Sequence, residues 1–316
     1  MAITKIHQSG KDPMRLDKGE SIFFAREVEH IKSKTYDAKP KELKALLYIP
    51  INTDAGPGAR VITYRRFTGV GFAKIISDYA HDFPRVDVYG VEESVNVHSV
   101  GTSYGYNIME IRTAAMVPGS NLDSRRAATA RRANDEKVND IAFRGDPEHK
   151  VPGLLKYPGI TETTLPADGV GGSTRFRDKT EDQVLRDFNI LTDAVMIPTF
   201  GREVPDTIFL PMQAYNFLAN KRLGDNETTL LQYILKNNPT IKRIEWLTEL
   251  SGIGEGKTDR VMVGKFTEEQ LTLELPQPFE QFDPVQEGME FSIPCHSRTA
   301  GVIVYYPMTI AYADGV

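Results

Sequence analysis

Polar and apolar residues alternate along residues 49–108, which is the period of a β-strand with one covered face. The strand-like segments ARVITYRRF, VGFAKII, RVDVYG and SVNVHSV follow one another with no helical repeat between them. Turn-forming residues interrupt them at 52–58 (NTDAGPG) and at Phe83-Pro84. The pattern therefore predicts long hairpins that have no helix to cover them.

Three helical repeats flank this stretch, at residues 18–36, 107–116 and about 120–144. The first follows a polar arm and repeats Phe24, Val28 and Ile31 along one side, a short stripe that indicates docking on a larger surface. The third would span about 37 Å. Its apolar stripe is thin and its remaining surface is basic, so we expect it to lie outside the core; the residues are Ala127, Ala130, Val138 and Ile141 against Arg125, Arg126, Arg131, Arg132 and Lys137.

The second half of the chain alternates helices and short strands. Gly145 is a plausible helix C-cap, and Thr180-Glu181-Asp182-Gln183 matches a capping box that opens a helix with the buried stripe Val184, Phe188, Leu191 and Val195. A strand at 207–210, a helix from Pro211, a helix at 228–236 and strands at 240–250, 260–266 and 270–275 follow, and the tail predicts two more strands. This alternation is typical of an α+β domain with a mixed sheet.

Composition narrows the functional classes. The chain has 316 residues, and 38 Lys and Arg against 43 Asp and Glu give a net charge of −5, which excludes a polybasic DNA-binding protein but not a local basic surface. A single cysteine, Cys295, cannot form an internal disulfide. No apolar run is long enough to cross a bilayer, so we expect a soluble product of the cytoplasm with no membrane contact.

Two short motifs suggest catalysis or nucleotide binding. Gly101-Thr-Ser103-Tyr-Gly105 matches the nucleophile elbow of serine hydrolases, with His149 and His296 downstream. The upstream chain lacks the βα units that such an elbow needs, so a structural turn is favoured and a hydrolase using Ser103 is kept as an alternative. Residues 251–258 end in Gly-Lys-Thr like a phosphate-binding loop, but a strand follows instead of a helix, which favours a hairpin loop.

No metal or cofactor site is predicted. The six histidines, at 7, 30, 81, 98, 149 and 296, lack the spacing of metal ligands. Asp146, Glu148 and His149 share one loop, which we interpret as solvated. Cys295 and His296 are adjacent and would point to opposite faces of a strand.

Taken in order, these pieces resemble the major capsid proteins of tailed bacteriophages with the HK97-type fold. The likeness runs from about residue 20 to the C-terminus. It is carried by long segments in one order: FFAREVEHIKSKTYDAK, AGPGARVITYRRFTGVGFAKII, RRANDEKVNDIAFRGD, GDPEHKVPGLL, LLQYILKNNPTIKRIEWLTEL and PCHSRTAGVIVYYPMTIAYADG.

The resemblance implies a division of the chain into named parts. They are an N-terminal arm (1–48), an extended E-loop (49–92), a P-domain (93–184) that includes a spine helix (120–144), an A-domain (185–285), and return strands of the P-domain (286–316). In such shells the A-domains meet at the capsomer centre and the E-loop overlies a neighbouring subunit. This agrees with a hairpin and helices whose apolar stripes exceed their internal partners.

The resemblance also implies that the functional residues form contact surfaces between subunits and not a catalytic site. On the E-loop, Ile62, Tyr64, Phe67, Phe72 and Ile75 would supply apolar contacts to a neighbour, and Arg65, Arg66 and Lys74 would pair with its acidic groups. In the arm, Phe24, Val28 and Ile31 would make a second contact. The spine arginines Arg125, Arg126, Arg131 and Arg132 would face the lumen or another subunit. No catalytic residue is assigned, and Lys74 alone does not establish a covalent crosslink.

The function implied is that of a self-assembling structural protein, not an enzyme. Pentamers and hexamers would close into an icosahedral shell around double-stranded DNA, bound without sequence specificity. Portal, scaffold and possibly cement proteins would be further partners, with assembly in the host cytoplasm and the virion capsid as the final location. An encapsulin-like compartment that holds enzyme cargo is the alternative within the same fold.

Overall fold

The computed structural model describes residues 41–75, 83–116, 122–224 and 227–316. The chain divides into two units, Met1–Glu42 and Leu43–Val316. The architecture below is that of the second unit. The helix predicted at 18–36, with Phe24, Val28 and Ile31, lies outside the described residues.

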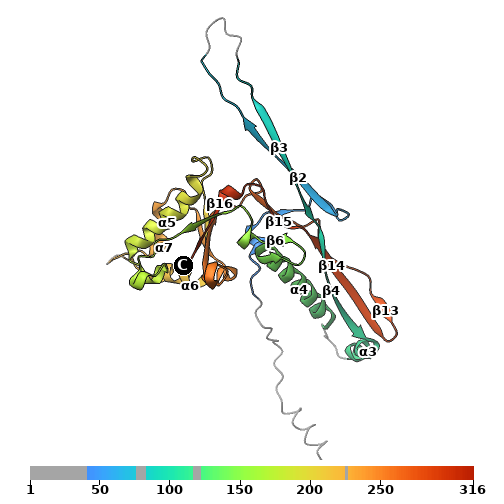
Figure 1. Ribbon diagram of the computed structural model, residues 1–316. Helices are drawn as coiled ribbons and strands as arrows, with labels where there is room; N and C mark the ends of the chain where they lie inside the picture. The colour runs from blue at the N-terminus through green and yellow to red at the C-terminus, as the bar shows by residue number, and fades with distance from the viewer. Residues whose placement is uncertain (1–40, 76–82, 117–121, 225–226) are drawn as a thin grey trace, which may run out of the picture. The chain divides into compact units, whose positions relative to one another are not determined.

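The largest sheet in the described part of this unit is a five-stranded mixed sheet, which lies toward the left in Figure 1. Its strand order is β7-β16-β10-β8-β9. The two outer pairs are parallel and the two inner pairs are antiparallel. The strands are β7 (Thr161–Thr164), β8 (Thr207–Leu210), β9 (Arg243–Trp246), β10 (Arg260–Gly264) and β16 (Ile310–Asp314). The predicted mixed sheet is confirmed. One of its strands, β16, comes from the C-terminal tail of the chain.

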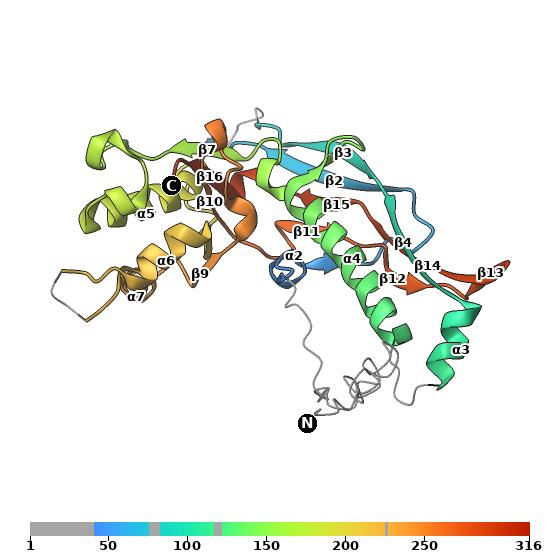
Figure 2. The ribbon, with the colours of Figure 1, turned by 90° about the horizontal axis from the view of Figure 1, so that it is seen from below.

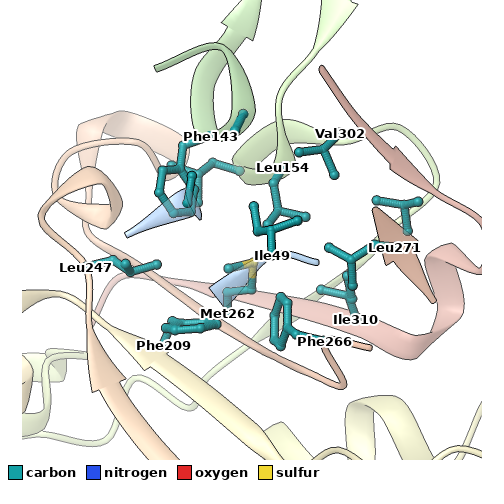
Figure 3. Packing of buried hydrophobic residues seen from close by; sticks show 14 of the residues in the cluster. Ile49, Phe143, Leu154, Phe209, Leu247, Met262, Phe266, Leu271, Val302 and Ile310 are labelled. Atoms are coloured by element: carbon teal, nitrogen blue, oxygen red, sulfur yellow. The ribbon is translucent and has the colours of Figure 1, made fainter. Parts of the chain in front are cut away.

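Each face of this sheet covers a separate hydrophobic core. Alternate residues of β16 divide between them: Ile310 and Tyr312 pack in one cluster, and Ala311 and Ala313 in the other. The first core also holds Phe209, Met262 and Phe266 (Figure 3). Because both faces are covered there, the inner strands β8 and β10 are buried at every position and β16 at all but its last, whereas the edge strands β7 and β9 keep exposed polar residues.

Three helices cover the second core. They are α5 (Glu181–Met196), α6 (Met212–Asn220) and α7 (Leu230–Asn237). Capping boxes at Thr180 and Thr229 begin α5 and α7, so the predicted start of α5 is confirmed. The predicted stripe of α5 is buried completely, with Val184, Phe188, Leu191 and Val195 all at most 2% exposed.

The long helix α4 (Leu122–Arg144) lies along a second sheet, made of β4 (His98–Asn107), β12 (Gln277–Gln281), β13 (Val285–Glu287) and β14 (Glu290–Thr299) (Figure 2). The prediction that α4 stays out of the core is wrong for its C-terminal half, where Val138 and Phe143 are buried in the first core. Two buried asparagines extend the face of α4 that packs against the rest of the protein. Asn134 accepts a hydrogen bond from the Ser297 hydroxyl at 2.7 Å, and Asn139 accepts one from the Ala45 N–H at 3.0 Å.

A third sheet contributes residues to the first core. It joins β1 (Ile51–Asn52), β11 (Leu271–Glu274) and β15 (Gly301–Val304), with the short helix α2 (Ala45–Tyr48) beside it. After α4, Gly145 adopts a φ of 76° and leads into the short pair β5 (Gly145–Asp146) and β6 (Val151–Pro152). A Cβ on Gly145 would lie 2.4 Å from the Val151 carbonyl oxygen, so the predicted glycine cap is confirmed.

The predicted hairpin is formed by β2 (Val61–Val70) and β3 (Asp87–Asn96), paired antiparallel over ten positions. Only Val97 separates β3 from β4, which pairs in turn with β14. Helix α3 (Ile108–Met116) follows β4 as predicted. Other details differ from the predictions. Residues 71–75 of the predicted strand VGFAKII do not form a strand, and the strand predicted at 240–250 is limited to β9. The tail supplies three strands, β14, β15 and β16, instead of two.

Candidate assembly surfaces

The base of the β2–β3 hairpin contacts its own subunit. The Tyr64 ring packs edge-on against Tyr305, with 5.3 Å between ring centroids. On the same face of β2, Arg66 donates from Nη1 to the Tyr305 carbonyl oxygen at 3.2 Å. Burial, helped by the hydrogen bond that the Tyr64 hydroxyl donates to Glu93, raises the pKa of Tyr64. Ile62, Tyr64 and Arg66 therefore share the half-buried face of the strand.

Beyond Arg66 the hairpin exposes large apolar side chains. Phe67 is 70% exposed and lies across Gly90, its partner on β3, where a Cβ would come within 3.0 Å of the ring. Phe72 and Ile75, which follow the end of β2, are also exposed. Exposed apolar area that is contiguous is typical of an association surface.

Sequence reasoning missed the returning half of this surface. Phe83 and four residues of the returning chain are more than half exposed; the four are Val86, Val88, Tyr89 and Val91. The ladder places Val88 opposite Gly69 and Tyr89 opposite Thr68. The signal was present in RVDVYGVEE, because its valines and its tyrosine belong to a predicted hairpin that has no helix to cover it.

The basic residues of the hairpin pair first within the hairpin. Arg65 donates from Nε to Glu92 at 2.9 Å, and Arg66 forms an ion pair with Glu93. Both carboxylates lie on β3. Lys74 is exposed in the segment after β2. Contact of these three residues with a neighbour stays a prediction.

Acidic partners also accompany the arginines of α4. Arg126 binds Glu110 of α3 through both terminal nitrogens, at 2.9 and 3.1 Å, and this hydrogen bonding lowers the pKa of Glu110. Arg131 and Arg132 lie 3.9 and 2.7 Å from Asp135 and Glu136, one turn further along the helix. Arg125 is exposed. Most of the positive charge expected on this helix is therefore balanced locally.

The elbow-like motif is not an elbow. Ser103 lies in the middle of β4, opposite Pro294 of β14, and the strand continues to Asn107. The prediction of a turn is wrong, because serine and glycine alternate here along the exposed face of a strand. In the described part of the chain no hydrogen bond joins Ser103 to a histidine. The geometry of a serine nucleophile is absent from this strand.

The glycine-rich segment 251–258 is a loop followed by β10, as predicted, but it is not a hairpin loop, because β8 lies between β9 and β10 in the sheet. Its amide groups are already bonded to carboxylates: the Glu255 N–H donates to Asp314 and the Gly252 N–H to Asp259, both at 2.9 Å. A phosphate would need such amides free at the start of a helix. The loop is therefore not built as a nucleotide site.

The loop histidine and its acidic neighbours bond to one another. The Nδ1 atom of His149 lies 3.1 Å from Asp146, and hydrogen bonding to His149 lowers the pKa of Asp146. Lys137 lies 3.8 Å from the same carboxylate. On β14, Cys295 is buried and His296 half-buried, which confirms their opposite faces, and burial raises the pKa of the Cys295 thiol.

Among the helices that the structure describes, none combines the length and the apolar character required to cross a membrane.

Comparison with known proteins agrees with this architecture. The family model described as major capsid protein matches residues 71–316. No curated protein matches the chain in sequence.

Solved structures resemble the chain over nearly its whole length. The capsid of Myoviridae phage XM1 is 20% identical with a TM-score of 0.78, over 92% of this chain and 98% of the other. The Mycobacterium phage Adephagia structure is 12% identical with a TM-score of 0.63, over 95% and 97%. A virus-like particle from Pyrococcus furiosus is 12% identical with a TM-score of 0.53, over 85% and 91%.

Proposed function

Because this chain belongs to the major capsid protein family and is thus a structural protein of a capsid shell, not an enzyme, we propose that its copies close into an icosahedral container for the double-stranded DNA of a tailed phage. The observation that carries the proposal is the family match over residues 71–316. A hairpin with a large exposed apolar surface supports it.

We propose that pentamers and hexamers are the building units and that the parts divide as the family resemblance implies. The E-loop (49–92) then contains β2 and most of β3, the spine helix is α4, and the A-domain (185–285) contains α5, α6 and α7. The P-domain joins 93–184 to the return strands of 286–316. The pairing of β4 with β14 over ten positions supports that last assignment, because it ties these two segments into one sheet.

The proposed role of the hairpin is to bind a neighbouring subunit. A two-stranded ribbon is at best marginally stable alone, since the conformational entropy cost of ordering is roughly 1–2 kcal/mol per residue. The base is supported by Tyr305, but Phe67, Phe72 and Ile75 are each at least 70% exposed. We therefore assign Phe67, Phe72 and Ile75 to the centre of the contact, together with the exposed residues of β3, and Arg65 and Lys74 to its polar rim. Ile62, Tyr64 and Arg66 share the half-buried face beside Tyr305, so they would reach a neighbour only with their exposed parts.

The remaining partners follow from the same role. A shell that packages DNA needs a portal, and a scaffold and cement proteins are proposed as further partners. Any luminal contact with DNA would be with phosphates and independent of sequence. The proposed contacts are Arg125 and the partly neutralised Arg126, Arg131 and Arg132. Assembly in the host cytoplasm is also proposed.

Negative-stain microscopy of the purified protein tests the proposal. We expect shells or capsomers, with a 35.4 kDa monomer at most a minor species. Sedimentation should give the same result. A monomer that persists at every concentration and ionic strength, with scaffold present, would show that the chain does not build a shell.

Limited trypsin digestion should distinguish the free from the assembled hairpin. Arg60, Arg65, Arg66, Lys74 and Arg85 offer cleavage points. We expect fast cleavage in dissociated subunits and slow cleavage in particles, because a neighbour would cover the ribbon. Mass spectrometry of the fragments identifies the sites.

The bond after Arg260 is the internal control, since its side chain is buried and should resist in both states. Equal resistance of the hairpin in both states would mean that it folds within its own subunit and that the interface lies elsewhere.

A further inference from the structure

The turn that follows α5 presents an aromatic side chain to solvent. Phe200 is 90% exposed and has a φ of 53°, in the left-handed region that glycine adopts without strain. Its neighbours brace this conformation. The Thr199 hydroxyl donates to the Val195 carbonyl oxygen at 2.8 Å, and the Gly201 N–H donates to the Met196 carbonyl oxygen at 2.8 Å.

Neither property helps the isolated subunit. A left-handed backbone is unfavourable for a residue with a Cβ, and exposure of a phenyl ring to water is unfavourable as well. Conformations of this kind persist where the surrounding structure holds them, and they cluster at binding sites. The turn therefore fixes the backbone of a phenylalanine whose ring is exposed to solvent in the free subunit.

An uncharged groove of about 400 Å³ is lined by residues of α5 and α7, which are labelled in Figure 1. Its apolar side chains are Leu185, Phe188, Met196, Tyr233, Ile234 and Pro239, and asparagines and threonines complete its lining. None of the lining residues is charged, although 26% of the chain is. Since Phe200 is almost wholly exposed, it does not occupy the groove of its own subunit.

We propose that Phe200 of one copy inserts into the α5–α7 groove of a second copy. The proposal rests on the proposed shell, in which every copy presents both the ring and the groove. An uncharged phenyl ring suits an uncharged groove, since neither the ring nor the groove lining carries a charge that would lose its water. The groove volume falls within the range of about 300–1,000 Å³ that accepts small organic groups.

Disulfide trapping tests the pairing directly. The only native cysteine, Cys295, is buried, so a Phe200→Cys, Tyr233→Cys variant reports its own crosslinks. We expect covalent dimers on a non-reducing gel if two grooves exchange rings reciprocally, and a ladder up to the size of the capsomer if contacts run around a ring. Either result supports the proposal. The matched control, Phe200→Cys with Glu287→Cys on β13, should not crosslink above the level of each single variant.

Particles that assemble from the double variant and yet give no crosslink would overturn this proposal and leave the shell intact. Failure of the wild-type chain to form particles would instead contradict the proposed function.

Replacement of Phe200 separates binding from folding. Phe200→Gly relieves the backbone strain, so the free subunit should melt at the same or a higher temperature, while the critical concentration for assembly should rise about tenfold or more, as for a central aromatic contact. Val170→Ala removes another exposed side chain, 85% exposed, and should leave assembly unchanged. A lower melting temperature with normal assembly would assign Phe200 a role in folding only.

Discussion

Replacing Asp187 with alanine should destabilise the subunit by about 3–5 kcal/mol, because it removes the buried partner of Lys179 and leaves only the more distant Asp168. The side chains of Lys179 and Asp187 are both 0% exposed and form an ion pair beside the start of α5. Arg186 donates to the other oxygen of Asp187 at 2.8 Å, and Asp168 lies 3.6 Å from the Lys179 ammonium group. Urea unfolding of dissociated subunits, followed by the fluorescence of Trp246, measures the loss.

The control replaces both buried charges with apolar groups of similar length. In Lys179→Met, Asp187→Leu, no unpaired charge remains in the interior, so most of the lost stability should return. Asp193→Ala removes an exposed carboxylate from the same helix and should change the unfolding free energy by less than about 0.5 kcal/mol. A loss below about 1 kcal/mol for Asp187→Ala would mean that the ion pair stays hydrated.

Arg260→Ala should lower the free energy of unfolding by a similar amount, about 3–5 kcal/mol. Arg260 is only 4% exposed, and its acidic partners would keep their charges after it is removed. Its Nε and Nη2 atoms donate to the two oxygens of Asp314 at 2.6 and 2.8 Å, and Nη1 donates to the Leu155 carbonyl oxygen at 2.8 Å. The guanidinium carbon lies 4.5 Å from the centre of the Tyr312 ring. Arg260→Lys should not restore stability, because an ammonium group cannot bind both carboxylate oxygens and stack on a ring.

Acid titration checks the same interaction. Burial acts to raise the pKa of Asp314, but hydrogen bonds from Arg260 and the Glu255 N–H outweigh it and lower the pKa. A carboxyl whose pKa is lower in the folded state stabilises the fold above its unfolded value, near 3.8, and loses that contribution as the pH falls through the folded value. The gap in stability between wild type and Asp314→Asn should therefore close below about pH 4. A gap that stays constant down to pH 2 would contradict the pairing.

Features set by neighbouring residues could be predicted from the sequence. The capping box at Thr180, the stripe of α5 and the hairpin of β2 and β3 all follow from local spacing. The burial of α4 could not be predicted, because it depends on asparagines whose partners lie far away in the chain, such as Ser297. The pair Lys179 and Asp187 reads as an ordinary charged surface until tertiary packing covers it.

The candidate surfaces show the same limit. The alternation of polar and apolar residues identified the apolar side chains of β2. It did not show which face of the strand is covered, because that depends on the contact with Tyr305, which is distant in sequence. The five-residue match around Ser103 was misleading, since a strand with small residues on one side satisfies the same pattern. The sequence does not single out Phe200 as a contact residue. The proposal for Phe200 depends on its positive φ, which the sequence does not show.

The sheet shared by the two cores has a thermodynamic consequence. Melting one core would strip a whole face from β8, β10 and β16, whose opposite faces build the other core. Exposing that face would cost about 25 cal/mol for each Å² of apolar area, so neither half gains by unfolding first. We therefore expect the two cores to unfold together, as one cooperative unit that includes both the proposed A-domain and the proposed P-domain.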